Sequence, residues 1–264
     1  MNVPYYRVDA FTRTAFRGNP ASVVMLPDWL DDCTLQAIAA EENAAATAFV
    51  VATGDEFALR WFAPGSELEL CGHATLAAGY VLLGRLRDDR AGVTFATRAG
   101  PLQARRDGDR VGLDFPALPP RNERPVQEVS GALGVRVHAV WEAPGARALA
   151  VLREPVRVRE MRPNVTAIAA LPYSALIVTA RGLEDDCDFI SRYFAPKHGI
   201  AEDSVTGSAH CVLTPYWAAV LEKPVLFARQ VSARGGELWV EDCGDRVRIA
   251  GQCVPIAHGT LTLP

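Results

Sequence analysis

An internal repeat constrains this chain more than any other feature of its 264 residues. The segment Phe57–Pro64 reads FALRWFAP and recurs at Phe189–Pro196 as FISRYFAP, an offset of 132 because 189 minus 57 is 132. The glycine at Gly72 recurs at Gly207, where the offset is 135, so three residues are inserted in between. Ordered matches at a nearly constant offset indicate an internal duplication. The sequence therefore predicts two similar halves, each with a turn that leads into a helix at the glycine.

The order of segments within each half predicts an α+β fold. Short strands with alternating apolar residues surround an apolar helix at 72–83 whose small residues are typical of a helix buried on all sides. We expect two pseudo-symmetric halves, each an antiparallel β-barrel around a central helix. The proline-rich stretch 116–125 predicts a linker, which places the halves at 1–118 and 126–264. A last strand at 254–263 has no counterpart before the linker, and its return to the first half stays open.

Composition and charge exclude several classes of partner. The formal net charge is −4, which gives no general basic field for nucleic acid or an anionic membrane. No apolar run reaches the roughly 18 residues of a membrane helix. The first residues also lack the pattern of a signal peptide. We therefore expect a cytoplasmic protein with a small-molecule partner, and neither a nucleic-acid nor a membrane partner.

The cysteines and histidines predict neither a disulfide framework nor a metal site. No two cysteines form a C-x-x-C pair, and free thiols are the expectation for a chain of this length without a signal peptide. The five histidines are scattered, without zinc-ligand spacing. The cysteines are Cys33, Cys71, Cys187, Cys211, Cys243 and Cys253.

The two predicted helix starts, at Gly72 and Gly207, are candidates for binding an anion. The first N–H groups of a helix have no partner inside it, and that end carries partial positive charge. Glycine lets a ligand approach the backbone closely, which suits a carboxylate. If the halves pack about a pseudo-twofold axis, both starts face one cleft. In the alternative, each glycine simply begins a buried helix.

Polar side chains beside the two glycines are the candidates for chemistry. His73 can carry a proton, Asp203 precedes the second helix closely enough to lie at its mouth, and Ser208 can bind substrate. Cys71 directly precedes Gly72, an electropositive place that lowers the pKa of a thiol. Each has a structural alternative: a packed histidine, an aspartate that favours the helix end, a serine bonded to local backbone and an inert buried cysteine.

Five motifs in order resemble the PhzF family, named for phenazine biosynthesis, and the similarity covers essentially the whole chain. The resemblance implies a diaminopimelate-epimerase-like fold with the active site between two barrel-and-helix halves. It also implies an isomerase that moves a proton in a cyclic, unsaturated carboxylic acid, works without a cofactor and often forms a homodimer. The motifs are VDAF at 8–11, GNPA at 18–21, WFAP at 61–64, CGHATL at 71–76 and EDSVTGSAHC at 202–211.

The resemblance also assigns residues to the site. His73, Asp203 and Ser208 match the family's polar active-site positions, and the two glycines match its substrate-binding helix starts. Asn19, within the second motif, is a further substrate-binding candidate. One departure matters: the family segment reads like NLSETAF, with a glutamate as general acid/base, whereas this chain reads NAAATAF at 43–49 and has Ala46 at that position. Losing such a group typically lowers the rate by about 10²- to 10⁴-fold.

Three explanations of this departure stay open. In the first, another group relays the proton: Glu42, Cys71, His73 or Asp203. Cys71 matches the base cysteine of related epimerases, which allows an epimerase or a dehydratase-like lyase, although their second cysteine falls near Thr206. In the second, the site only orients and polarises a reactive acid, as in a tautomerisation of secondary metabolism such as antibiotic biosynthesis. In the third, the protein binds small carboxylates without catalysis.

Overall fold

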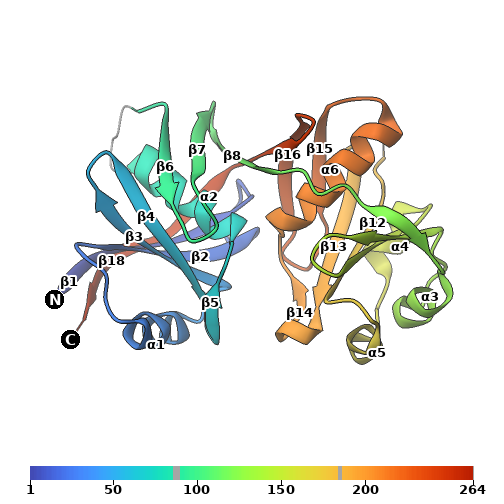
Figure 1. Cartoon of the computed structure of the whole chain (residues 1–264), viewed down its shortest axis with the longest axis horizontal. Helices are drawn as coiled ribbons and strands as arrows, with labels where there is room; N and C mark the ends of the chain where they lie inside the picture. Colours follow the sequence, from blue (N-terminus) through green and yellow to red (C-terminus); the bar gives the residue numbers. More distant parts are fainter. Residues whose placement is uncertain (86–89, 184–185, 264) are drawn as a thin grey trace. The chain divides into compact units, whose positions relative to one another are not determined.

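Two structural units divide the chain. Unit 1 contains Met1–Phe115 and Ile249–Pro264, and unit 2 contains Pro116–Arg248. Figure 1 shows the computed structural model of the chain, which describes residues 1–85, 90–183 and 186–263.

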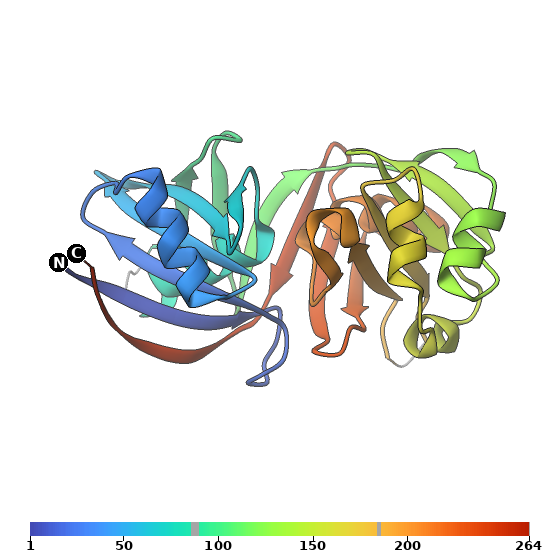
Figure 2. The same cartoon turned by 90° about the horizontal axis from the view of Figure 1, so that it is seen from below.

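The last strand of the chain belongs to unit 1. β18 (Cys253–Thr262) pairs antiparallel with β1 (Asn2–Ala10) along the whole length of β1. The two ends of the chain meet in Figure 2, and the N–H of Leu263 donates a 2.7 Å hydrogen bond to the carbonyl of Met1. The units therefore differ from the sequence-based halves, 1–118 and 126–264, because β18 completes the hydrogen bonding of β1 and the proline-rich stretch belongs to unit 2.

The described residues of unit 1 form a mixed β-sheet and two α-helices. Its remaining strands are β2 (Asn19–Leu26), β3 (Ala46–Thr53), β4 (Glu56–Ala63), β5 (Ser66–Leu68), β6 (Gly92–Ala96), β7 (Leu102–Asp107) and β8 (Arg110–Pro116). Its helices are α1 (Asp32–Glu42) and α2 (Gly72–Tyr80), and a π-helical turn (Val81–Arg85) extends α2.

Unit 2 has the same succession of strands and one long helix. Its strands are β9 (Arg121–Arg124), β10 (Ala139–Ala143), β11 (Arg147–Val151), β12 (Ala175–Arg181), β13 (Phe189–Ala195), β14 (Ile200–Asp203), β15 (Val225–Gln230), β16 (Gly236–Asp242) and β17 (Arg246–Gly251), whose last residues belong to unit 1. Its helices are α3 (Gln127–Leu133), α4 (Pro155–Glu160), α5 (Val165–Ala170), the 3₁₀ turn η2 (Pro196–His198) and α6 (Gly207–Leu221).

The same series of strand pairings occurs in both units, which confirms the predicted duplication. In unit 1 the pairs are antiparallel β1–β2, parallel β2–β3, antiparallel β3–β4 and β4–β5, parallel β4–β6 and antiparallel β6–β7. In unit 2 they are β10–β11, β11–β12, β12–β13, β13–β14, β13–β15 and β15–β16, with the same directions. Each sheet is thus mixed rather than purely antiparallel, because helices connect the strands that end up parallel.

A repeated ion pair also marks the duplication. In unit 1 the Nε and Nη2 atoms of Arg60 contact Glu67 at 2.7 and 2.9 Å, and in unit 2 those of Arg192 contact Glu202 at 2.7 and 2.8 Å. The arginines are 132 residues apart and the glutamates 135. The three additional residues lie between Pro196, which matches Pro64, and Glu202.

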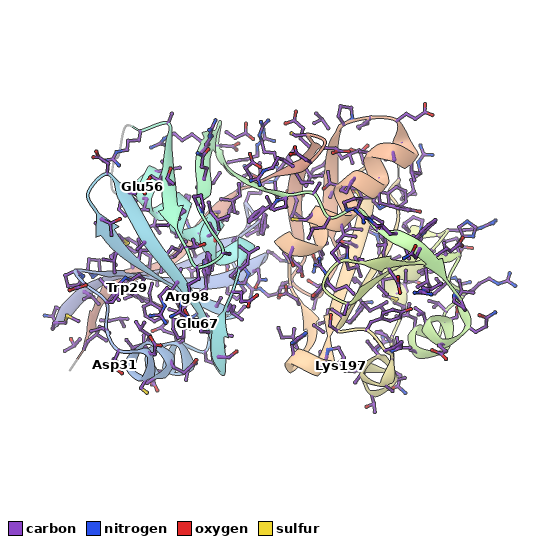
Figure 3. The ribbon with its side chains drawn as sticks, in the orientation of Figure 1. Trp29, Asp31, Glu56, Glu67, Arg98 and Lys197 are labelled. Carbon is purple, nitrogen blue, oxygen red and sulfur yellow. The ribbon has the colours of Figure 1, made fainter. Side chains whose placement is uncertain are left out.

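This ion pair gives a stability prediction. The hydrogen bonds from Arg60 hold the pKa of Glu67 below its usual range, and Arg98 also contacts Glu67 at 2.6 Å (Figure 3). A carboxyl whose pKa is depressed by folding stabilises the protein above its unfolded pKa, and the contribution is lost as the pH falls through the folded pKa. We expect Glu67→Gln to lower the free energy of unfolding at pH 7 by about 1–2 kcal/mol, and by less in acid. Urea unfolding at both pH values measures this.

Exposed Glu69 provides the matched control, because Glu69→Gln removes the same charge at a residue that has no ion pair with any other described residue. A loss in Glu67→Gln that is equal at pH 7 and in acid would contradict the electrostatic explanation.

The two helices of unit 1 contact opposite faces of its sheet. α1 begins after Asp31, whose carboxylate accepts from the N–H of Thr34, and it packs on the face that carries Val24 and Phe49 (Figure 2). Alternate residues of β3, beginning with Ala46, point to the other face, where α2 packs. The residues of α2 from His73 to Gly79 are buried, as the sequence predicted for a central helix.

α6 continues through Pro215, although a proline removes one hydrogen bond of a helix. The carbonyl that Pro215 leaves without its usual donor belongs to Cys211, and it accepts a 2.9 Å hydrogen bond from the N–H of Leu118. The proline-rich stretch is therefore attached to α6 by the carbonyl that the proline exposes.

Candidate active site

The start of α2 brings a thiol and an imidazole into contact. Cys71 is the N-cap residue of α2 and His73 is its second residue. Their side chains are buried, and the Sγ of Cys71 lies 3.4 Å from the Nδ1 of His73. A thiol and an imidazole at this distance can exchange a proton. The backbone is fixed at this point because the N–H and hydroxyl of Thr75 both donate to the carbonyl of Cys71.

Ala46 lies at the beginning of β3, on the face of the sheet that α2 covers. It is fully buried. Trp61 is opposite Ala48 on the same face, and among the described residues its indole Nε1 has no hydrogen-bond acceptor. A methyl group at position 46 supplies neither an acceptor for this N–H nor a proton carrier.

Glu42, the last residue of α1, directs its carboxylate to the opposite face of that sheet, where its Oε2 has hydrogen-bond partners. Its Oε2 accepts hydrogen bonds from the hydroxyls of Tyr5 at 2.5 Å and Ser22 at 2.8 Å, and Arg7 lies 3.7 Å away. Ser22 is two residues from Val24 on the α1 side of β2. Burial and the bond to Glu42 raise the pKa of Tyr5. The sequence could not assign Glu42 to a face, and the structure places it away from Ala46.

Asn19 is fully buried at the first position of β2, opposite Ala10 of β1. The turn before it contains Gly18 at a φ of 66°, where an added Cβ would lie 2.1 Å from the carbonyl oxygen of Ala10. Glycine at position 18 therefore lets the chain enter β2 with Asn19 on the inside.

At the start of α6, two hydrogen-bonded side chains fix the backbone. The hydroxyl of Thr206, the N-cap residue, donates to the Oδ2 of Asp203 at 2.6 Å. Gln230, almost fully buried at the end of β15, accepts from the N–H of Thr206 and donates to the carbonyl of Asp203, both at 2.8 Å. This clamp orients the carboxylate of Asp203 and the first turn of α6.

A buried arginine contacts the first turn of α6. The Nη1 of Arg147, the first residue of β11, lies 3.1 Å from the carbonyl oxygen and 3.5 Å from the Oγ of Ser208. Tyr193 lies close enough to Arg147 and Asp203 for both charges to act on its hydroxyl. Burial raises the pKa of Tyr193, the positive charge of Arg147 lowers it, and the negative charge of Asp203 raises it. Unit 2 thus brings Asp203, Ser208, Arg147 and Tyr193 together.

The two helix starts have equivalent positions but different chemistry. Cys71 corresponds to Thr206 and His73 to Ser208, at the same offset of 135 as the glycines. The α2 start carries a thiol–imidazole pair, whereas the α6 start carries hydroxyls, a carboxylate and a guanidinium. Sequence reasoning named Cys71, His73, Asp203 and Ser208 but missed Arg147, Gln230 and Tyr193, because nothing in the local pattern links those residues to α6.

The described residues were also compared with what a disulfide, a metal site, a membrane helix or a separate pocket would require. All six cysteines are free thiols. Among the described residues, no three His, Cys, Asp or Glu side chains gather as a metal site requires, and no helix is long and apolar enough to cross a membrane. A hollow of about 780 Å³ lies in unit 2 beside Gly134, Arg136 and Arg153, and contains none of the candidate residues.

The sequence matches one protein family, both in a family model and in individual relatives. Residues 8–259 match a family model described as PhzC-PhzF, phenazine biosynthesis-like protein. The chain is 46% identical over 263 residues to an uncharacterized isomerase of Pseudomonas aeruginosa, with 100% of both chains covered. It is 39% identical over 287 residues to a phenazine biosynthesis-like domain-containing protein of Homo sapiens, covering 99% of this chain and 100% of the other.

A solved structure agrees with this result. The crystal structure of a PhzF family protein from Enterococcus faecalis matches over 100% of both chains, with a TM-score of 0.95 and 41% identity. The resemblance seen in the sequence motifs and the α+β fold class are thereby confirmed.

Proposed function

Because the chain belongs to the PhzC-PhzF family of phenazine biosynthesis-like proteins, we propose that it is a cofactor-independent isomerase of a small, unsaturated or cyclic carboxylic acid. The observation that carries this proposal is the contact between the Sγ of Cys71 and the Nδ1 of His73 at the start of α2. It supplies a proton-transferring pair in a chain that has Ala46 where the resemblance implies a glutamate. The name of the Pseudomonas aeruginosa relative, an isomerase, supports the reaction class.

In the proposed reaction the Cys71–His73 pair removes a proton from the carbon next to the unsaturated system. The C–H bond breaks, its electron pair enters the conjugated system, and a proton is returned to another carbon of that system. No atom is gained or lost, so the step requires no co-reactant. A thiol and imidazole in contact can share the removed proton, which allows removal and return by the same pair.

Asp203 is the second proton-carrying group in the proposal, and Ser208 binds the substrate. The 2.6 Å bond from the hydroxyl of Thr206 orients the carboxylate of Asp203, and orientation of this kind is what a general acid or base needs. Gly72 and Gly207 keep their predicted role of letting substrate approach the helix starts, and Asn19 stays a substrate-binding prediction. Glu42 is left out of the proposed proton relay because Tyr5, Ser22 and Arg7 engage its carboxylate.

The proposal is tested by hydrogen exchange. The protein is incubated in D₂O with a panel of small unsaturated and cyclic carboxylic acids, and deuterium in each acid is followed by mass spectrometry. We expect Asp203→Asn to slow the exchange by about 10²-fold or more, because asparagine keeps an acceptor for the hydroxyl of Thr206 but cannot take a proton. The matched variant Glu42→Gln, which also removes one carboxylate, is expected to leave the rate unchanged.

Two results would contradict the proposal. Equal rates in Asp203→Asn and the wild type would remove Asp203 from the proton relay. Saturable binding of an acid without exchange or turnover of any acid in the panel would favour the alternative of a carboxylate-binding protein. The homodimer, the cytoplasmic location and a role in antibiotic biosynthesis stay predictions.

A further inference from the structure

The hollow of about 780 Å³ in unit 2 is lined only by residues of that unit. It lies where α3 ends before Gly134, where β10 begins, and where β11 leads into α4 (Figure 1). None of the residues named in the proposed function lines it. Sites for small molecules typically have volumes of about 300–1,000 Å³. The hollow is therefore large enough for a metabolite.

The pairing of β10 with β11 brings two arginines of this hollow together. Ala139, the first residue of β10, is opposite Val151, the last residue of β11. The N–H of His138 continues this pairing with a 2.8 Å hydrogen bond to the carbonyl of Val151. Arg136 and Arg153 therefore lie at the same end of the two strands. The Nε of Arg153 also donates to the Nδ1 of His138 at 3.3 Å, which connects the two segments.

The lining of the hollow is positively charged, although the protein as a whole is negatively charged. Three arginines and one glutamate line it, which gives a formal charge of +2 with His138 neutral, whereas the whole chain carries −4. Glu154 lies 3.3 Å from Arg157. Arg136 and Arg153 have no ion pair with any described residue. The hollow thus contains two positive charges for which the described residues supply no carboxylate.

Apolar side chains also line the hollow. Val137 and Leu152 are buried and Val135 is half-buried, whereas Arg136 and Arg153 are exposed. The hollow therefore combines apolar side chains with a charged rim. Sites for organic ligands typically have this combination, in which apolar side chains supply contact area and a few polar groups fix the orientation of the ligand.

A phosphate monoester matches both features. Its charge at pH 7 is about −1.5 to −2, which is close in size to the formal charge of the lining. A planar guanidinium binds phosphate oxygens through two parallel hydrogen bonds. The organic part of the ester provides the surface that apolar side chains can contact, whereas inorganic phosphate has no such part.

We propose that this arginine-lined hollow binds a phosphate monoester of a small organic molecule. Arg136 and Arg153 contact the phosphate, and Val135 and Leu152 contact the organic part. The site lies within unit 2 and uses no residue of the proposed proton relay. The inference is therefore independent of the proposed isomerase activity.

The alternative is that these arginines are ordinary solvated surface groups. Arginine is the usual cation of this chain, in which Lys197 and Lys223 are the only lysines. A single exposed ion pair contributes little to binding. In that case phosphate compounds bind weakly wherever arginine is exposed, and no arginine matters more than another. The proposal instead requires binding that depends on the two arginines of the hollow and on the organic part of the ligand.

NMR titration of the ¹⁵N-labelled protein distinguishes the two explanations. The probes are AMP, ribose 5-phosphate and phenyl phosphate, their phosphate-free counterparts adenosine, ribose and phenol, and inorganic phosphate. We expect one or more of the esters to bind about 10-fold or more tightly than both its counterpart and inorganic phosphate. The backbone amide signals that shift should be those of residues 134–138 and 152–157.

Substitution of the two arginines tests their assignment. Arg136→Gln and Arg153→Gln each remove one positive charge, and each should weaken binding of that ester by about 5- to 10-fold. Arg121→Gln is the matched control, because Arg121 is an exposed arginine of unit 2 at the other end of β10, opposite Glu142. This variant should bind the ester as the wild type does. The spectra without ligand check that each variant is folded.

The inference is overturned if no ester binds more tightly than its phosphate-free counterpart, or if inorganic phosphate binds as tightly as every ester. It is also overturned if both Arg136→Gln and Arg153→Gln bind the ester as tightly as the wild type, because the phosphate is then held elsewhere in the protein. Equal weakening in Arg121→Gln would assign the effect to general surface charge. Deuterium exchange of the carboxylic acid panel should be unchanged in Arg136→Gln and Arg153→Gln, so this inference and the proposed function fail by different results.

Discussion

Serine in place of Cys71 is expected to slow the exchange of substrate hydrogen with solvent deuterium by about 10²- to 10⁴-fold. The Sγ of Cys71 lies 3.4 Å from the Nδ1 of His73, so the thiol can pass a proton to the ring or receive one from it. A serine hydroxyl has nearly the same shape but is a much weaker acid, and it cannot replace the thiol as a proton carrier. The D₂O experiment with the carboxylic acid panel measures the effect.

Replacing His73 by glutamine is expected to have a similar effect, because the two groups act as one unit. For the same reason the double variant should be no slower than the slower single variant, since residues that act together give non-additive losses. Cys33→Ser is the matched control, at an exposed cysteine of unit 1. Urea unfolding of each variant checks that α2 still folds.

The outcome separates the open explanations of the missing glutamate. A loss in His73→Gln with an unchanged rate in Cys71→Ser would make His73 the base alone and would contradict the thiol-based epimerase or lyase. Unchanged rates in both variants would leave orientation and polarisation of a reactive acid as the mechanism. A loss in both supports the proton-transferring pair.

Mild acid is expected to destabilise unit 2 through His210. This ring is completely buried in α6, where its Nδ1 donates to the carbonyl of Thr206 at 2.9 Å, and its Nε2 has no hydrogen-bond partner among the described residues. Burial lowers the pKa of His210 from 6.5 to about 4. Below pH 6.5 the unfolded chain binds a proton that the folded chain does not bind until near pH 4. Stability therefore falls with pH across this window, by about 3 kcal/mol in total.

His210→Gln removes the titrating group, so it should remove the fall in the free energy of unfolding between pH 6.5 and pH 4. This expectation holds whatever the effect of the substitution on stability at pH 7. The comparison is between free energies of unfolding in urea at pH 7 and pH 4 for the wild type and His210→Gln. His198→Gln changes an exposed histidine of the same unit and should keep the slope of the wild type. An identical slope in His210→Gln would show that other groups cause the loss in acid.

The repeat in the sequence was sufficient to predict the duplicated architecture. Residues near each other in the chain, such as the FALRWFAP block and the glycine that follows it, form a strand, a turn and a helix start in both halves. Two copies in the same order therefore specify the same series of strand pairings. The departure at Ala46, where the resemblance implies a glutamate, was also inferred from the sequence alone, because it needs only the comparison of one short motif.

Contacts between distant residues were decided by the tertiary structure. Glu42 is four residues from Ala46 in the chain, yet the two residues lie on opposite faces of the sheet, because alternation along β2 and β3 sets which side chains share a face. The return of β18 to β1, and the approach of Arg147 and Gln230 to α6, join segments separated by many residues. Such contacts are set by the register of the strands and by side-chain packing. No short stretch of sequence reveals the register or the packing.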